Sequence, residues 1–196
     1  MGSLSSDFSA RMVLIRHGQT AWNVERRFQG RSDIPLNDTG RGQAQEAAKN
    51  LMVYQQQIRE HTPEFAWELI VTSPLSRAYE TGKIIGEHLN LDISGTHEGL
   101  QERSFGAAEG LVATDYHWRD IQEQFSDVEP LSEMIQRGIS ALKEIVAEHP
   151  NCHIIVVAHG LWIAQIMTAL TGEEHGIPEN ASVTELPLHI LESYQG

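Results

Sequence analysis

Two histidines in this sequence share a setting that suits catalysis, because each follows an apolar run and precedes a glycine. His17 follows "MVLIR" and precedes Gly18, whereas His159 follows "IIVVA" and precedes Gly160. A neutral imidazole is a competent nucleophile toward phosphorus. The pair therefore predicts a reaction centre, provided that the fold brings the two rings together.

Arginines and carboxyl groups extend this set. Arg16 adjoins His17, and Arg77 lies early in a predicted helix within "TSPLSRAYET". Glu102 and Glu109 both lie in "LQERSFGAAEG". Arginine clamps phosphoryl oxygens with paired donors, and a carboxylic acid of raised pKa can protonate a leaving oxygen. The combination predicts phosphoryl transfer, with either glutamate as the acid.

An α/β fold would collect these residues at one place. Apolar runs of strand length alternate with helical patterns, which predicts a three-layer α/β/α sandwich: a mostly parallel sheet with helices on both faces. Strands are predicted at 12–15, 67–73, 91–96, 153–160 and 181–191, and helices at 40–60, 74–89, 131–146 and 161–172. Pro187 inside the last predicted strand indicates an edge position.

The carboxyl ends of such strands are where ligands bind in open α/β sheets. His17 and His159 both fall just past a predicted strand, so they would meet at one edge if their strands are neighbours. Gly18 and Gly160 would let a substrate approach the backbone closely.

Length and composition restrict the class of protein. The 196 residues fit one domain, expected at 12–196, with 1–11 as a flexible tail or an artificial extension. A net charge of −13 argues against a nucleic-acid or anionic-membrane partner. The single cysteine, Cys152, rules out an intramolecular disulfide, and no run is long and apolar enough for a membrane span. We therefore expect a cytoplasmic protein.

Other hydrolytic chemistries have little support in the sequence. The chain has ten histidines but no HExxH motif and no Cys/His cluster, so a zinc site is weakly supported and no metal is expected. A GxSxG nucleophile elbow is also absent, which disfavours a serine hydrolase of that type.

Five motifs in order give the sequence a specific resemblance. "RHGQTAWN" is followed by "RRFQGRSDIPLNDTGRGQA", "SPLSRAYET", "ERSFGAAEG" and "VVAHG". This series resembles the histidine phosphatase superfamily, which contains cofactor-dependent phosphoglycerate mutases and many small phosphatases. The resemblance covers roughly residues 12–186 and implies a phosphohydrolase of the histidine acid phosphatase type.

The resemblance also implies roles for individual residues. His17 matches the nucleophile that becomes a phosphohistidine, and Glu102 matches the proton donor, with Glu109 as a rival. Arg16 and Arg77 match the phosphate-binding arginines, and His159 matches the second histidine of the phosphate pocket. The implied substrate-binding residues are Arg16, Asn23, Gln29, Gly30, Arg77 and Gly160. Arg26 or Arg27 is a further candidate contact, although a surface arginine is equally expected.

The implied mechanism has two steps and needs neither metal nor organic cofactor. His17 attacks phosphorus in line while Glu102 protonates the departing alcohol. Water activated by the ionised Glu102 then hydrolyses the phosphohistidine, with the arginines and His159 stabilising the charge.

Four functions remain as hypotheses. Family mutases usually carry a longer insertion after the proton-donor loop, whereas only about twenty residues separate Gly110 from Leu131 here. "RFQG" is also more typical of the phosphatase branch, so a phosphatase of small phosphorylated metabolites is favoured over a cofactor-dependent phosphoglycerate mutase. A catalytically silent phosphate-binding module is the third hypothesis. A metal-dependent hydrolase that uses the many histidines is the fourth, and it would require chelator-sensitive activity. The segment 110–131 is expected to choose the substrate, and a homodimer through an exposed last strand stays open.

Overall fold

The computed structural model describes residues 10–195, which form a five-stranded sheet with the strand order β3-β2-β4-β1-β5. The strands are β1 (Met12–Arg16), β2 (Leu69–Thr72), β3 (Ile93–Thr96), β4 (Ile154–Ala158) and β5 (Val183–Leu186). Only β5 runs antiparallel to its neighbour, β1, and the other pairs are parallel. The mostly parallel sheet is therefore confirmed.

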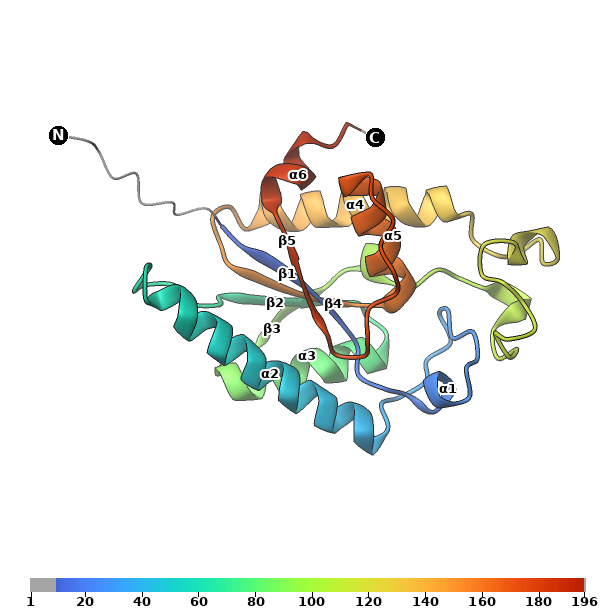
Figure 1. Cartoon of the computed structure of the whole chain (residues 1–196), viewed down its shortest axis with the longest axis horizontal. Coiled ribbons are helices and arrows are strands. Elements are labelled where there is room, and N and C mark those ends of the chain that lie inside the picture. Colours follow the sequence, from blue (N-terminus) through green and yellow to red (C-terminus); the bar gives the residue numbers. More distant parts are fainter. Residues whose placement is uncertain (1–9, 196) are drawn as a thin grey trace.

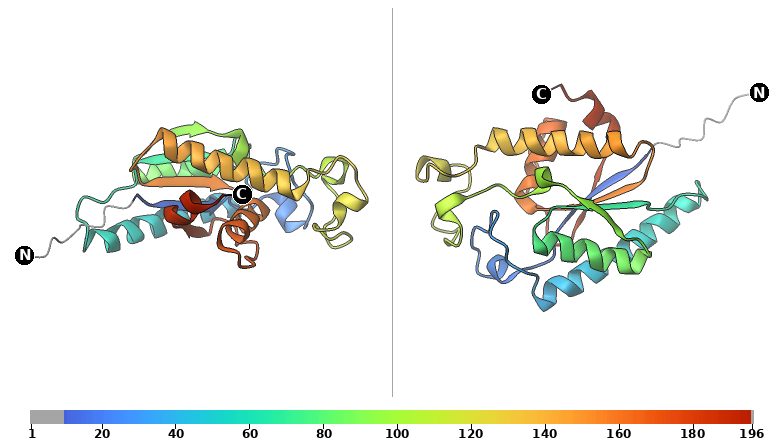
Figure 2. Two further views of the ribbon diagram at one scale, coloured as in Figure 1. Left: turned by 90° about the horizontal axis from the view of Figure 1, so that it is seen from above. Right: turned by 180° about the vertical axis from the view of Figure 1, so that it is seen from behind.

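Helices cover both faces of this sheet (Figures 1 and 2). One face carries α2 (Asp38–Arg59) and α3 (Ser76–Leu89), and the other carries α4 (Leu131–Glu148), α5 (Gly160–Thr171) and the short α6 (Leu188–Ser193). Successive strand residues point to opposite faces, so Val13 and Ile15 join the core under α2 and α3, whereas Met12 and Leu14 join the core under α4 and α5. The predicted three-layer sandwich is confirmed.

The last predicted strand, 181–191, is wrong in its second half. β5 is an edge strand as expected, but it ends at Leu186, and Pro187 precedes α6 rather than lying inside the strand. Leu188 and Leu191, three residues apart, both pack on the core under α4 and α5. That spacing suits a helix, and proline is well tolerated just before one.

Two irregular segments lie together at the carboxyl end of the parallel strands (Figure 1). The first contains the one-turn α1 (Ala21–Val24), and the second, residues 105–128, contains the 3-10 turns η2 (Gly106–Ala108) and η3 (Ile121–Glu123). We call 105–128 the lid segment. Its apolar residues Phe105, Ala108, Ile121 and Val128 form a small core with Phe28 and with Leu161 of α5.

The start of the chain differs slightly from expectation. Residues 1–9 of the predicted tail lie outside the described residues, but Arg11 belongs to the folded domain, because its carbonyl accepts a hydrogen bond from Ile154 at 2.8 Å. Among residues 10–195, no helix has the length and apolar character that crossing a membrane requires.

Candidate active site

The two histidines lie side by side because β1 and β4 are neighbouring parallel strands. Arg16 is paired with Ala158, and the backbone amide of His17 donates to the Ala158 carbonyl at 3.0 Å. The ring centroids of His17 and His159 are 5.2 Å apart, and the rings meet edge to face. Both residues are buried, so the sheet supplies the paired imidazoles that the sequence predicted.

A backbone contact fixes the tautomer of His17. Its Nδ1 lies 2.7 Å from the carbonyl oxygen of Gly18, and because a carbonyl only accepts, Nδ1 carries the proton and Nε2 keeps a lone pair. Burial, followed by the nearby charges of Arg77 and Arg16, lowers the pKa of His17 well below 6.5. The ring is therefore neutral near pH 7, with a nucleophilic nitrogen.

Arg16 and Arg77 are held by backbone carbonyls rather than by carboxylates. Nη1 of Arg16 donates to Pro178 at 2.7 Å, and Arg77 donates to Ser32 at 2.8 Å and to Gly30 at 2.7 Å. Burial lowers the pKa of Arg77 to about 10, which leaves it charged at neutral pH. These fixed cations with neutral partners attract an anion.

Unpartnered polar atoms concentrate at this point. Among the described residues, the buried side-chain nitrogens and oxygens without a hydrogen-bond partner are Arg16 Nε, Arg77 Nε, His159 Nδ1 and Thr72 Oγ1. Leaving a buried donor unpaired costs about 1–3 kcal/mol. The first three atoms belong to the predicted site, which indicates a ligand that supplies several acceptors.

Glu102 lies at the N-terminus of α5. Its Oε1 accepts from the backbone amides of Arg103 at 2.9 Å and Trp162 at 3.0 Å, and its Oε2 accepts from Leu161 at 3.1 Å. Burial raises the pKa of Glu102, and the backbone hydrogen bonds and nearby arginines only reduce that rise. A carboxyl group in this setting is suited to hold a proton for a leaving group.

Glu109, the rival acid, serves a different purpose in the structure. Its carboxylate accepts from the backbone amides of Arg31 at 2.9 Å, Ser32 at 2.8 Å and Phe105 at 3.1 Å. A side chain at Gly30, where φ is +52°, would overlap this carboxylate. Glu109 therefore joins the loop at residues 30–32 to the start of the lid segment.

A cavity of about 190 Å³ opens above the arginines. All six predicted substrate-binding residues line it: Arg16, Asn23, Gln29, Gly30, Arg77 and Gly160. His17 and Glu102 line it too, and its walls are Arg27, Phe28, Phe105, Ala113, Trp118, Leu161 and Ile177. His159 is fully buried against the ring of His17. The structure thus places the other predicted catalytic and binding residues around one cavity, with His159 against His17 but not among the lining residues.

Two side-chain amides that line the cavity are held through their oxygen atoms. Asn23 Oδ1 accepts from the backbone amide of Thr20 at 3.0 Å, and Gln29 Oε1 accepts from the Thr20 hydroxyl at 2.8 Å. Neither amide nitrogen donates to a protein atom among the described residues. Both amides line the cavity, so each has donors left for an anion.

Gly160 is required by close packing against Arg16. A Cβ atom there would come within 2.9 Å of Arg16 Nε and 2.8 Å of Ile177 Cγ2. Of the two further arginine candidates, Arg27 lines the cavity and donates to the Gly110 carbonyl at 2.6 Å. Arg26 is not among the lining residues.

Sequence reasoning missed two hydroxyl residues that contact residues of the site through hydrogen bonds. Thr81 accepts from the backbone amide of Gly18 at 3.1 Å, and so supports the residue that orients His17. Ser73 contacts His159 Nε2 at 2.8 Å. Both lie within or beside the quoted "TSPLSRAYET", but a hydroxyl in a motif does not reveal its partner across the sheet.

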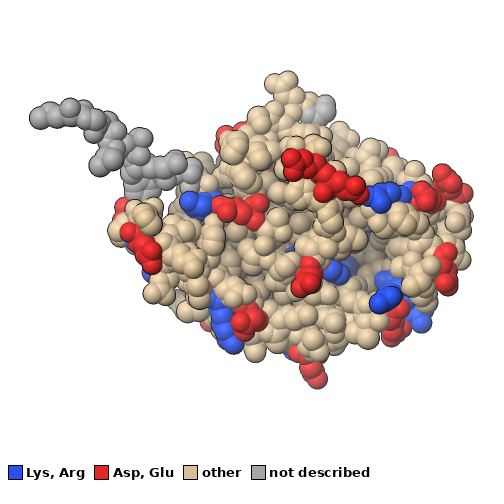
Figure 3. Space-filling model, viewed as in Figure 1, with Lys and Arg blue, Asp and Glu red and all other residues tan. Residues whose placement is uncertain are grey.

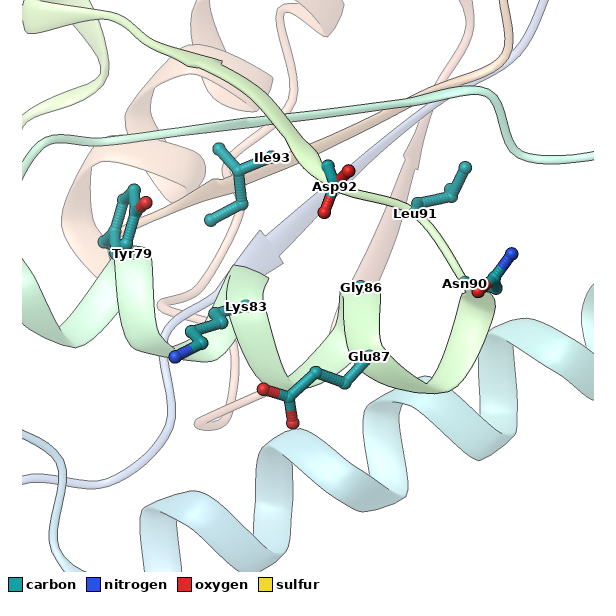
Figure 4. A pocket seen from close by; sticks show the side chains of 8 residues that line it. All are labelled: Tyr79, Lys83, Gly86, Glu87, Asn90, Leu91, Asp92 and Ile93. Atoms are coloured by element: carbon teal, nitrogen blue, oxygen red, sulfur yellow. The ribbon is translucent and has the colours of Figure 1, made fainter.

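A second cavity, on another part of the surface, differs from this site in the charges of its lining residues. A cavity of about 550 Å³ between α3 and β3 is lined by one cation, Lys83, and two carboxylates, Glu87 and Asp92, together with Tyr79 and Asn90 (Figure 4). Acidic side chains are spread over the face shown in Figure 3. Within residues 10–195, no group of three or more His, Cys, Asp or Glu side chains could hold a metal ion.

Comparison with known proteins places this arrangement in a family. The chain belongs to the histidine phosphatase superfamily (branch 1), whose family model matches residues 12–196. It is 37% identical to the uncharacterized phosphatase PhoE of Bacillus subtilis, over 86% of this chain and 79% of that protein. It is 34% identical to phosphoglycerate mutase-like protein 4 of Arabidopsis thaliana, over 77% of this chain and 66% of that protein.

A solved structure with a similar fold is that of a mycobacterial glucosyl-3-phosphoglycerate phosphatase in complex with VO3. It has a TM-score of 0.74 and 30% sequence identity, and the match covers 91% of this chain and 93% of that one. The similarity therefore extends over nearly the whole of both chains.

Proposed function

We propose that this protein is a metal-independent phosphomonoester phosphatase that works through a phosphohistidine on His17. The observation that carries the proposal is the set of three buried, unpartnered nitrogens beside a neutral imidazole and a buried carboxyl group. The oxygens of a phosphoryl group would accept from Arg16, Arg77 and His159. The charge that develops on them would then meet donors already in place.

In the first step, Nε2 of His17 forms a bond to phosphorus and the phosphorus–oxygen bond of the ester breaks. Glu102 transfers its proton to the departing oxygen, so an alcohol leaves and Glu102 becomes a carboxylate. In the second step, Glu102 takes a proton from water as the water oxygen attacks phosphorus. The nitrogen–phosphorus bond breaks, its electron pair returns to His17, and inorganic phosphate is released.

Hydrolysis is favoured over mutase activity by the size of the site. A mutase must also hold a second hydroxyl compound to intercept the phosphohistidine, and the cavity measures only about 190 Å³. A cofactor-dependent phosphoglycerate mutase is the second candidate, because several of the relatives carry mutase or mutase-like names. A silent phosphate-binding module is less favoured, since nucleophile, acid and arginines are all present and meet in one cavity.

The proposed substrate is a small phosphorylated metabolite handled in the cytoplasm, and not a nucleic acid or a membrane lipid. The upper walls of the cavity are mainly apolar, with Phe28, Phe105 and Trp118 among them. We therefore expect a compact leaving group that presents carbon to these walls. Arg27 is the charged side chain of the wall.

A phosphatase screen over a panel of phosphorylated metabolites tests this function. Phosphoglycerate mutase activity is assayed beside it, with and without 2,3-bisphosphoglycerate, and all assays are repeated in EDTA. We expect phosphate release from at least one monoester, unchanged by EDTA. Isomerisation that exceeds phosphate release would establish the mutase instead, and loss of activity in EDTA, with recovery on adding a divalent metal, would exclude the metal-independent mechanism.

A further inference from the structure

Ser73 lies directly beyond β2 and is fully buried. Its hydroxyl oxygen is 2.8 Å from Nε2 of His159 and lies 3.4 Å from the backbone amide of Leu75, which donates to it. The contact with His159 joins positions 86 apart in the sequence, so the fold brings this hydroxyl to the ring.

The hydrogen-bonding capacity of Ser73 decides which nitrogen of His159 carries the proton. A serine hydroxyl has one proton to donate, and the Leu75 amide can only donate to it. Among the described residues, His159 Nε2 is the acceptor within reach of that proton. Use of that proton therefore favours a lone pair on Nε2 and, in the neutral ring, the proton on Nδ1; the reverse would leave the hydroxyl proton without an acceptor.

The surroundings of His159 keep its imidazole ring neutral. Burial, with Arg77 as the next cause, lowers the pKa of His159 well below 6.5. Nδ1 is also one of the three unpartnered buried nitrogens of the site. A protonated Nδ1 would be a donor without an acceptor until an anion binds.

We propose that Ser73 is a positioning residue that holds His159 in the Nδ1-protonated form, so that the ring donates a hydrogen bond to a phosphoryl oxygen. The opposite tautomer would direct a lone pair toward the anion and leave the Ser73 hydroxyl without an acceptor. This inference rests on the proposed function for the identity of the ligand.

Both imidazoles then carry their proton on Nδ1, but one ring uses its lone pair and the other uses its proton. In His17, the Gly18 carbonyl accepts from Nδ1 and leaves the lone pair of Nε2 free for attack. In His159, the Ser73 hydroxyl donates to Nε2 and leaves the proton of Nδ1 free for donation. One contact therefore makes a nucleophile, and the other makes a hydrogen-bond donor.

The test uses two-bond proton–nitrogen NMR spectra of the full chain with ¹⁵N-labelled histidine, assigned with His159→Asn. In the parent protein we expect His159 to be protonated on Nδ1 alone, and inorganic phosphate to shift that resonance. Ser73→Ala should give a mixture of tautomers and lower the kcat on a phosphomonoester by about tenfold. Ser73→Thr, which keeps a hydroxyl, should restore the Nδ1 tautomer.

Thr72→Val is the matched control, because it removes a buried hydroxyl that has no hydrogen-bond partner one position earlier. It should leave the spectrum and the kcat unchanged. Protonation of His159 on Nε2 in the parent protein would overturn the proposal, as would a Ser73→Ala variant with unaltered tautomer and kcat. The tautomer in the parent spectrum is read without turnover, so failure of the phosphatase function would be recognised separately.

Discussion

Burial has opposite chemical consequences for His17 and Glu102. It disfavours the charged form of each, so it lowers the pKa of the imidazole and raises the pKa of the carboxyl group. A neutral nucleophile and a carboxyl group that keeps its proton to a higher pH than usual can then lie in one site. This is the pair of protonation states that the first phosphoryl-transfer step requires.

The pH dependence of kcat/KM should reflect these two shifts. Protonation of His17 should lower the rate only well below pH 6.5, because its pKa lies well below that value. Ionisation of Glu102 should lower the rate on the alkaline side, at a pH above the ordinary carboxyl pKa of 4.5. Steady-state rates on an alkyl phosphate measure both limbs, and a one-proton rise centred near pH 6.5 would contradict a depressed His17 pKa.

Replacing Glu102 by Gln should affect substrates according to their leaving groups. We expect a loss of about 10²–10⁴-fold with an alkyl phosphate, which needs an acid, and a much smaller loss with p-nitrophenyl phosphate. Glu109→Gln is the matched variant and should lower both rates to a similar extent, because Glu109 holds backbone amides. If Glu109→Gln shows the leaving-group dependence and Glu102→Gln does not, the acid is Glu109.

At the scale of elements, the sheet brings the reactive residues together and the lid segment encloses them. Arg103 is fully buried and donates to the carbonyls of Trp118 at 2.6 Å and Glu129 at 2.7 Å, and to the side chain of Gln122 at 2.9 Å. It follows Glu102 directly in the chain. One arginine therefore connects the backbone beside the proposed acid to the lid segment and the residue that follows it.

Arg103→Met should loosen the lid segment, because three acceptors lose their donor. We expect faster cleavage within 111–128 in limited proteolysis, together with a higher KM for phosphomonoesters. Arg119→Ala is the control, since Arg119 is an exposed residue of the same segment. Equal cleavage rates in the parent protein and in Arg103→Met would show that Arg103 does not hold the lid.

Some elements of the fold could be predicted from the sequence, and others could not. Apolar runs at 12–15 and 153–160 predicted the two central strands, and the glycines after them marked the sheet edge. The end of the chain is ambiguous in sequence, because "LPLHIL" is apolar at spacings that suit a strand or a helix, and only packing on the core under α4 and α5 separates the two. The lid segment has no repeating pattern, since its conformation depends on distant groups such as Arg103.

At the scale of the molecule, an acidic protein of net charge −13 contains a buried cationic centre. The centre consists of half-buried Arg16, buried Arg77 and two buried, neutral imidazoles at a small cavity. Burial of His17 and His159 in neutral form links stability to pH, because the unfolded chain binds protons that the folded chain does not.

The free energy of unfolding should therefore fall as the pH drops below 6.5, the ordinary pKa of histidine. Each buried histidine contributes up to about 1.4 kcal/mol per pH unit between its unfolded and folded pKa values. The raised pKa of Glu102 acts in the opposite direction, since its stabilising contribution is lost as the pH rises from 4.5 through its folded pKa.

Urea unfolding of the parent protein and of His159→Gln at pH 7.5 and 5.5 measures this linkage in phosphate-free buffer. The decrease in the free energy of unfolding between the two pH values should be smaller in the variant, which lacks one of the titrating groups. An equal decrease in both proteins would show that His159 is not buried in neutral form.

The most direct test of the whole account is to trap the covalent intermediate. The parent protein is incubated with a phosphomonoester labelled with ³²P at the phosphoryl group and quenched in alkali, and the label is located by peptide mass spectrometry. We predict an acid-labile, base-stable label on His17, with none in His17→Ala. Label on another residue, or equal label in His17→Ala, would contradict the proposed mechanism.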